Sequence, residues 1–596
     1  MRHMSLYTRL LSVAGLFVVC FASVASTAWA EDATGANYLP PTTVVYAEVT
    51  SPAELLAKVL NHPFVKNLQA TDEYKKLTEE NPDYLKARAG VGIFEFVVGR
   101  DWDQAIEDIG GEGVYLGVDS ATKGAVLLTH APKEKTLGEI RDRLIKAAKD
   151  DAARKGKELD IEEHEYRGHT VYKTKDAVAG VFGSWLVITN KPELGRTVAD
   201  RLLDGKGESL AALEEFNSAQ KKITGEPVAW AYVNIAAARD AGFAKELYRE
   251  KSDNPGVELL VGGILSTLKR APAGTAAVYL EEDSLRLAMN LPHDRLNIPA
   301  ERAFYFGEQG EGAALAPLQP KNSLLSVTSY RDVGEMWRRR SDLFNEKVNA
   351  DLAQADSNLS TVFAGLDFGR EVLGVLEPHV QILSAEQSFE GRDVRTPKIQ
   401  LPSMAMVFQL KEPEKMQRQL KVSFQSLIGL TNLGAGQNDL PQLEMQTEDV
   451  HGGKLVSATY ENLPEDVEVA NDIIYNFSPS LAFVEDHFIV ASTRELALEL
   501  MELSQAEAEP LRNGGRIVNT RATLDSETLR KSLDTNRDAL IAQNMLENGH
   551  TRQEAQREID TLFSLLRLAG DISVEIVTSD ETLRLETTLG LTATSE

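Results

Sequence analysis

The chain has 596 residues, of which 43% are hydrophobic, 26% charged and 7% aromatic, a composition typical of folded globular proteins. Its 90 acidic residues outnumber its 63 basic residues, and so acidic a surface repels phosphate backbones, which argues against a nucleic-acid partner. Cys20 is the single cysteine, so the sequence excludes a disulfide framework and a thiolate metal site.

Residues 1–30 have the pattern of a secretory signal peptide. Arg2 and Arg9 are basic, residues 10–24 are mostly apolar, and Ala28 and Ala30 form a small-residue cleavage site. The apolar run is short for a membrane span, so we expect cleavage after Ala30 and no transmembrane anchor thereafter. The single cysteine would leave with this segment. The sequence therefore predicts an exported, periplasmic or extracellular protein.

Two segments near the start and the middle of the chain resemble each other. Residues 39–55 and 318–333 each contain a proline turn, a strand of alternating character and the start of a helix. Ser51 and Ser329 lie where an N-cap is expected, and Glu54 follows Ser51 as in a capping box. This similarity is the first sign of an internal repeat.

The similarity continues in the same order along the chain. The matching segments are a strand and helix at 125–148 and 405–427, a hairpin at 166–172 and 450–456, a strand and helix at 185–194 and 487–496, and a helix and hairpin at 257–291 and 558–589. Because the matches keep their order, we interpret the chain as an internal duplication.

These patterns predict two tandem, internally similar α+β units. The first spans residues 39–297, the second spans residues 318–592, and residues 298–317 form a linker. Short strands alternate with helices and hairpin signals recur, so we expect mainly antiparallel or mixed sheets with helices packed on one face.

A pair of histidines is the best metal-binding candidate, and it is a weak one. His164 and His169 are five residues apart, whereas a zinc-protease helix places its histidines at i and i+4. Arg167 and Gly168 indicate a turn between them, so we expect a solvated hairpin. We therefore predict no metal site and no cofactor-binding residues.

No complete catalytic motif is present. Ser-x-x-Lys occurs at Ser120, Ser218 and Ser266, but the Lys-Thr-Gly motif that accompanies it in penicillin-interacting enzymes does not. The sequence contains no Gly-x-Ser-x-Gly elbow and no phosphate-binding loop. We assign no catalytic residue, and the sequence favours a protein that is not an enzyme.

Residues 39–55, placed after a signal peptide, and residues 209–216 resemble a family of large secreted bacterial proteins with a domain of unknown function. The resemblance covers much of the first half. It implies a cell-envelope location, and it implies neither an activity nor site residues.

Three functions remain open. The first is a non-catalytic envelope or extracellular protein that binds a protein or polymer partner or has a structural role. The second is a periplasmic carrier of a lipid or other apolar ligand, because a helix on a curved antiparallel sheet can leave an apolar cavity. The third is a hydrolase whose site forms only in space.

Overall fold

The computed structural model describes residues 34–591 except 72–73, 76–77, 80, 155–160, 244–250, 295–297, 308–309, 364, 393–394, 438–440, 461–471, 507 and 580. The predicted signal peptide, with Ala28, Ala30 and Cys20, lies outside the described residues. Among the residues that the structure does describe, no helix has the length and apolar character needed to cross a membrane.

The chain is an α+β protein that divides into two compact units. Of the described residues, unit 1 contains those of 34–243 and 271–292 together with Leu591, and unit 2 contains those of 251–270 and 293–590. Residues 251–270 thus belong to unit 2, although the chain on both sides of them belongs to unit 1.

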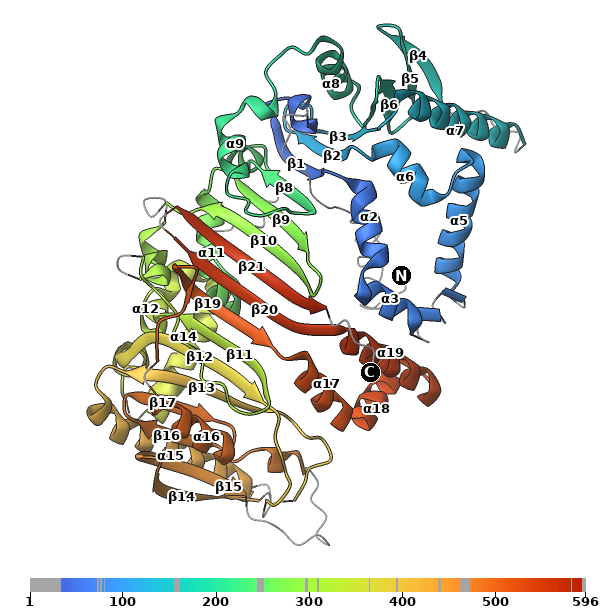
Figure 1. Cartoon of the computed structure of the whole chain (residues 1–596). Helices are drawn as coiled ribbons and strands as arrows, with labels where there is room; N and C mark the ends of the chain where they lie inside the picture. Colours follow the sequence, from blue (N-terminus) through green and yellow to red (C-terminus); the bar gives the residue numbers. More distant parts are fainter. Residues whose placement is uncertain are drawn as a thin grey trace. The chain divides into compact units, whose positions relative to one another are not determined.

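The sheet of unit 1 is antiparallel (Figure 1). Its strands lie in the order β4 (Glu162–Tyr166), β5 (His169–Lys173), β6 (Val178–Phe182), β7 (Trp185–Thr189), β3 (Gly124–His130), β2 (Gly113–Asp119), β1 (Thr43–Val49), β8 (Ala229–Val233), β9 (Gly274–Leu280) and β10 (Ser284–Pro292).

Helices cover both faces of the β6–β7 region in unit 1. Leu194 and Val198 of α8 pack with Val187 on one face, and Leu137 of α7 packs with Val181 and Leu186 on the other. The helices of the unit are η1 (Gly35–Asn37), α2 (Pro52–Asn61), α3 (Pro63–Ala70), α5 (Pro82–Val98), α6 (Trp102–Gly110), α7 (Glu134–Arg154), α8 (Pro192–Asp204), η2 (Leu210–Ala212), α9 (Glu214–Gln220) and α10 (Ile235–Asp240).

The sheet of unit 2 is antiparallel as well. Its strands lie in the order β14 (Leu443–Val450), β15 (Gly453–Tyr460), β16 (Ser480–Val484), β17 (His487–Ala491), β13 (Ser403–Leu410), β12 (Leu376–Ala385), β11 (Ser323–Tyr330), β19 (Arg516–Leu524), β20 (Ala569–Thr578) and β21 (Thr582–Leu591), and the short β18 (Arg512–Asn513) pairs with β19.

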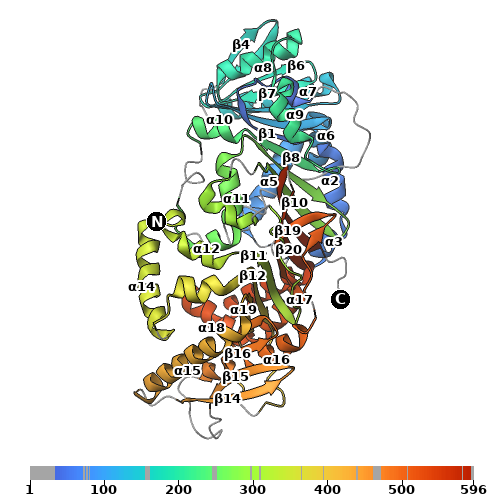
Figure 2. The ribbon, with the colours of Figure 1, turned by 90° about the vertical axis from the view of Figure 1, so that its left-hand side faces the viewer.

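Helices also cover both faces of the sheet around β16, so the expectation of helices on one face is wrong there (Figure 2). Ala482 packs toward Leu500 of α16, whereas Leu481 packs with Leu420 of α15 on the opposite face. Every residue of β16 is buried, because the strand has no solvated face.

The helices of unit 2 are α11 (Pro255–Arg270), η5 (Ala300–Phe306), α12 (Val333–Arg338), α13 (Arg340–Leu343), α14 (Glu346–Val362), η6 (Phe368–Val372), η7 (Leu373–Val375), α15 (Pro413–Gln437), η8 (Asp472–Asn476), α16 (Arg494–Leu503), α17 (Ser526–Thr535), α18 (Arg537–Asn548) and α19 (Arg552–Leu568). Residues 298–317, predicted as a linker, include η5, in which Tyr305 and Phe306 are buried.

A buried arginine fixes α11 within unit 2. The guanidinium of Arg331 donates to the carbonyl oxygens of Leu259 at 2.5 Å and Leu260 at 2.8 Å, both in α11. It also donates to Asn519 Oδ1 at 2.7 Å and Thr520 Oγ1 at 3.0 Å in β19. Burial lowers the pKa of Arg331 to about 10. These bonds join the helix to the sheet.

The two units share details beyond their strand order. The ladder between β1 and β2 shifts register between Thr43 and Val45, and the ladder between β11 and β12 shifts at the matching place, between Ser323 and Leu325. The β4–β5 turn has positive φ at Arg167 and the following glycine, and the β14–β15 turn has the same at His451 and its following glycine. These turns align the hairpins of the two units residue by residue.

Neither of the two serines predicted as helix N-caps makes a capping hydrogen bond. Ser51 occupies the N-cap of α2, but its side chain makes no capping hydrogen bond. Ser329 lies inside β11, where its hydroxyl is 2.8 Å from Thr520 Oγ1, and Asp332 caps α12 instead. The strand is longer than its alternating pattern predicted, which moves the start of the helix along the chain.

Candidate functional site

A pocket of about 490 Å³ lies within unit 1, between α8 and one face of β4–β7. Figure 2 shows α8 beside β6 and β7. Alternate residues of a strand point to the same face of a sheet, and on β5, β6 and β7 the lining residues are such an alternating set. We call this cavity the α8 pocket; its lining residues are His164, Glu165, Tyr166, Val171, Lys173, Val178, Gly180, Phe182, Val187, Thr189, Pro192, Gly195, Arg196 and Ala199.

Small residues keep the α8 pocket open. Gly195 and Ala199 lie on the side of α8 that faces the pocket, and Gly180 lies on β6 across from them. A Cβ atom built on Gly180 would come within 2.9 Å of the ring of Phe182, and one on Gly195 would come within 2.9 Å of the Thr189 methyl carbon. The absence of these side chains leaves an interior lined mainly by valine, phenylalanine and alanine.

The polar side chains of the α8 pocket belong to its mouth. Lys173 Nζ lies 2.9 Å and His164 Nε2 lies 3.0 Å from the same Glu162 carboxylate. Hydrogen bonding to Lys173, and then to His164, lowers the pKa of Glu162. Arg196 is exposed, and no hydrogen bond or ion pair joins it to another residue that the structure describes.

An ion-pair clamp ties the tip of the β4–β5 hairpin to α8. Arg167 donates to Asp200 at 2.8 Å and to Asp204 at 2.7 Å, and Tyr166 Oη donates to Asp200 at 2.9 Å. The bonds from Arg167 lower the pKa of Asp204, and burial raises the pKa of Tyr166. The clamp sets the spacing between hairpin and helix and so helps to hold the pocket open.

The same place in unit 2 is filled. α16 follows β17 at the same sequence spacing as α8 follows β7, and the β6–β7 and β16–β17 turns align at Gly183 and Glu485, both with positive φ. Smaller side chains, Ser480, Val484 and Ala491, match Val178, Phe182 and Thr189. At five other positions of the pocket interior the matching side chain of unit 2 is larger and fully buried. The pairs are Val171 and Leu455, Gly180 and Ala482, Val187 and Ile489, Gly195 and Ala497, and Ala199 and Met501.

The mouth also differs between the units. In unit 2, Arg494 donates to both carboxylate oxygens of Glu448, at 2.9 and 2.7 Å, across the start of α16. The matching residues of unit 1 are His164 and Pro192, which cannot form this pair. Unit 2 therefore bridges the position at which unit 1 is open.

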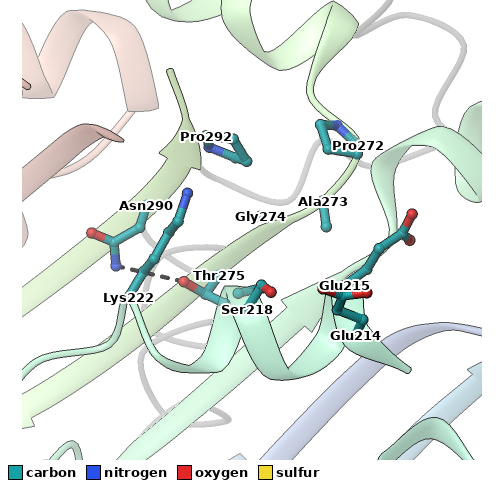
Figure 3. Close-up of a pocket in the computed structure, with 11 residues that line it drawn as sticks. Glu214, Glu215, Ser218, Lys222, Pro272, Ala273, Gly274, Thr275, Asn290 and Pro292 are labelled. Atoms are coloured by element: carbon teal, nitrogen blue, oxygen red, sulfur yellow. Dashed lines mark hydrogen bonds between the residues drawn. The ribbon is translucent and has the colours of Figure 1, made fainter. Parts of the chain in front are cut away.

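A second, smaller pocket of about 250 Å³ lies in unit 1 beside α9 (Figure 3). Lys222 extends over Asn290 and Thr275, and Glu214 and Glu215 lie toward the other end of α9. Asn290 Nδ2 donates to Thr275 Oγ1 over 3.5 Å, and both residues are buried. Both carboxylates are exposed to solvent.

Unit 2 holds two histidines at a cavity of about 30 Å³ between β11, β12, β13 and β17. Burial lowers the pKa of His379 and of His487, and the nearby Asp486 opposes that shift at His487. Nδ1 of His379 has no hydrogen-bond partner in the described part of the chain, whereas Nδ1 of His487 lies 3.1 Å from Asp486 Oδ1. The cavity is too small for a ligand larger than water.

The predicted metal candidates lie on the β4–β5 hairpin, on one face of it. His164 stands opposite Val171 and lines the α8 pocket, whereas His169 stands opposite Tyr166 and contacts the ring of Phe182. Within the described ranges, no group of three His, Cys, Asp or Glu residues could hold a metal ion. His164 thus belongs to a pocket mouth that the sequence analysis did not foresee.

The serines of the Ser-x-x-Lys matches have local partners. Ser120 Oγ donates to the carbonyl of Thr42, and Ser266 Oγ donates to the carbonyl of Gly263 inside α11. Ser218 lines the pocket beside α9 together with Lys222. The three serines therefore lie at unrelated places, and none contributes to the α8 pocket.

No protein-family model and no curated protein matches the chain. Among solved structures, crystal forms IV, I and III of TP0453 show 9%, 10% and 8% sequence identity to it. They cover 45%, 48% and 48% of this chain and 83%, 89% and 90% of their own, with TM-scores of 0.23, 0.24 and 0.24. These TM-scores are too low for the likeness to carry an argument about fold or function.

Proposed function

We propose that the chain is an exported, non-catalytic binding protein, and that the α8 pocket of unit 1 binds a small apolar ligand. One observation carries this proposal: the interior that Met501 and its neighbours fill in unit 2 is open in unit 1. Its volume falls within the range of small-molecule sites, about 300–1,000 Å³. A pocket lined by apolar side chains with polar groups at its mouth suits such a ligand.

We also propose that the two units arose by duplication and then diverged. The shared strand order, the shared register shift and the aligned turns support this history. Under this proposal, the interior of unit 2 remained filled by side chains, whereas a cavity developed in the interior of unit 1. Small residues at core positions cost stability, so their presence is best explained by a use for the space.

The arrangement of polar groups favours binding over catalysis. Lys173 and His164 share one carboxylate at the mouth of the α8 pocket, and the interior side chains of β6 and β7 are almost all apolar. General acid–base or nucleophilic chemistry requires a nucleophile and a base within hydrogen-bond reach of each other. The interior of the pocket offers no such pair among the described residues.

Calorimetric titration of the mature protein with 1-decanol tests the proposal. The wild-type chain is expected to bind about one molecule, and Ala199→Met, which places the side chain of unit 2 in the pocket, is expected to abolish binding. Thr197→Met adds the same side chain to α8 away from the pocket and serves as the matched control. Absence of binding to the wild type, or equal binding by Ala199→Met, would contradict the proposal.

A further inference from the structure

We propose that the ligand of the α8 pocket is a single-chain anionic amphiphile, whose acidic head group binds Arg196 while its apolar chain occupies the interior. This inference rests on the proposed function of the same pocket and adds the chemistry of the head group. It begins from Arg196, the one cationic lining residue with no described partner; Glu165, the other charged lining residue without one, is acidic.

Arg196 is placed to receive an anion. It lies on the pocket-facing side of α8, one residue after Gly195, and no described residue forms an ion pair with it. The other cations at the mouth are already engaged, since Lys173 and His164 both contact Glu162. The planar guanidinium of Arg196 can donate two parallel hydrogen bonds to a carboxylate or a phosphate.

Unit 2 supplies an internal comparison for this residue. The position that matches Arg196 is Leu498, which packs against the filled interior of unit 2. The arginine and the cavity are thus present together in unit 1 and absent together in unit 2. This pairing is expected if the charge serves the ligand.

The start of α8 adds a second attraction for an anion. Pro192, the first residue of α8, lines the pocket, so this helix end lies at the mouth. The N-cap residue Lys191 makes no side-chain capping bond, whereas Thr493 Oγ1 accepts from Leu496 N at the start of α16. The first N–H groups of a helix carry partial positive charge, and a side-chain cap would satisfy one of them. An acidic head group near Arg196 gains from this uncapped end.

The test compares ligands that share one chain and differ in the head group. The probes are decanoate, decyl phosphate, 1-decanol and decyltrimethylammonium, each titrated below its micelle concentration. Wild-type protein is expected to bind the two anions about ten- to hundredfold more tightly than the alcohol, the gain of one charge-assisted contact. The cation is expected to bind most weakly. The ratio of the affinity for decanoate to the affinity for decyl phosphate shows whether the site prefers a carboxylate or a phosphate head group.

Arg196→Gln is the decisive variant, because its side chain is exposed and its loss leaves the fold intact. It is expected to lose the preference for the anions and to keep the affinity for 1-decanol. Arg154→Gln removes an exposed arginine at the end of α7, whose side chain is 77% exposed, and is expected to change neither. Binding of 1-decanol without any preference for anions, or equal losses in the two variants, would overturn this inference alone. Failure of every probe to bind would overturn the proposed function.

Discussion

The side chain of Met501 in α16 fills, within unit 2, the space that Ala199 in α8 leaves open within unit 1. Met501 is fully buried, and Ala199 is 1% exposed and lines a pocket of about 490 Å³. The two residues hold matching places in the helices that follow β7 and β17 at the same sequence spacing.

Ala199→Met is expected to stabilise ligand-free unit 1 while it removes the binding site. Each buried methylene contributes about 0.8 kcal/mol, so a methionine that fits the pocket adds about 1–2 kcal/mol to the free energy of unfolding. Thermal unfolding of ligand-free protein measures the gain. A loss of stability would mean that the pocket is too tight for the side chain, contrary to its volume of about 490 Å³.

Met501→Ala makes the reverse change in unit 2. Truncation of a buried methionine is expected to cost about 2–5 kcal/mol, because the atoms around the new cavity relax only partly. Denaturant unfolding, followed by a probe in unit 2, measures the loss. A change below about 0.5 kcal/mol would show that this position is loosely packed, and the comparison between the units would fail.

Arg331→Ala is expected to destabilise unit 2 by about 3 kcal/mol or more. The change removes the bonds to Leu259 and Leu260 in α11 and leaves Asn519 Oδ1 short of a buried donor. Arg338→Ala, whose side chain is 61% exposed and pairs with Glu335, is the control and should change stability by less than about 1 kcal/mol. Equal effects of the two variants in denaturant unfolding would contradict the role given to Arg331.

His379 should make the stability of unit 2 depend on pH. Burial lowers its pKa in the folded state, so protonation favours the unfolded chain. The neutral imidazole's contribution is fully present above its ordinary pKa of about 6.5, and it is lost as the pH falls through the folded-state pKa. The free energy of unfolding of the wild type should therefore fall more steeply than that of His379→Gln between about pH 7.5 and 5.5. If the free energies of unfolding of the wild type and of His379→Gln changed in parallel with pH, burial of His379 would not be a source of the pH dependence.

Local patterns predicted many elements of the fold. The predicted hairpin at 166–172 lies within β4–β5, the helix at 257–269 lies within α11, and the helix at 558–568 lies within α19. Turn residues and apolar periodicity carry such information within a few neighbouring residues. The antiparallel pairing followed from the same hairpin signals.

The sequence analysis did not predict how elements far apart in the chain are placed in the fold. The position of α11 in unit 2 depends on Arg331, which lies far from it in sequence, and no local pattern encodes that contact. The α8 pocket was missed because its interior residues are glycine, alanine and valine, which carry no motif. A position-by-position comparison of the two halves could have shown it, since Ala199 and Gly180 match the larger Met501 and Ala482. That comparison required the residue alignment that the turns provide.

Native mass spectrometry of the mature protein, exported by its own host and purified without detergent, tests the central claim most directly. The account predicts a bound small molecule at close to one per chain in the wild type, and a bare mass for Ala199→Met purified in the same way. A bare wild-type protein, or the same adduct on both proteins, would contradict the claim that the α8 pocket of unit 1 is a ligand site.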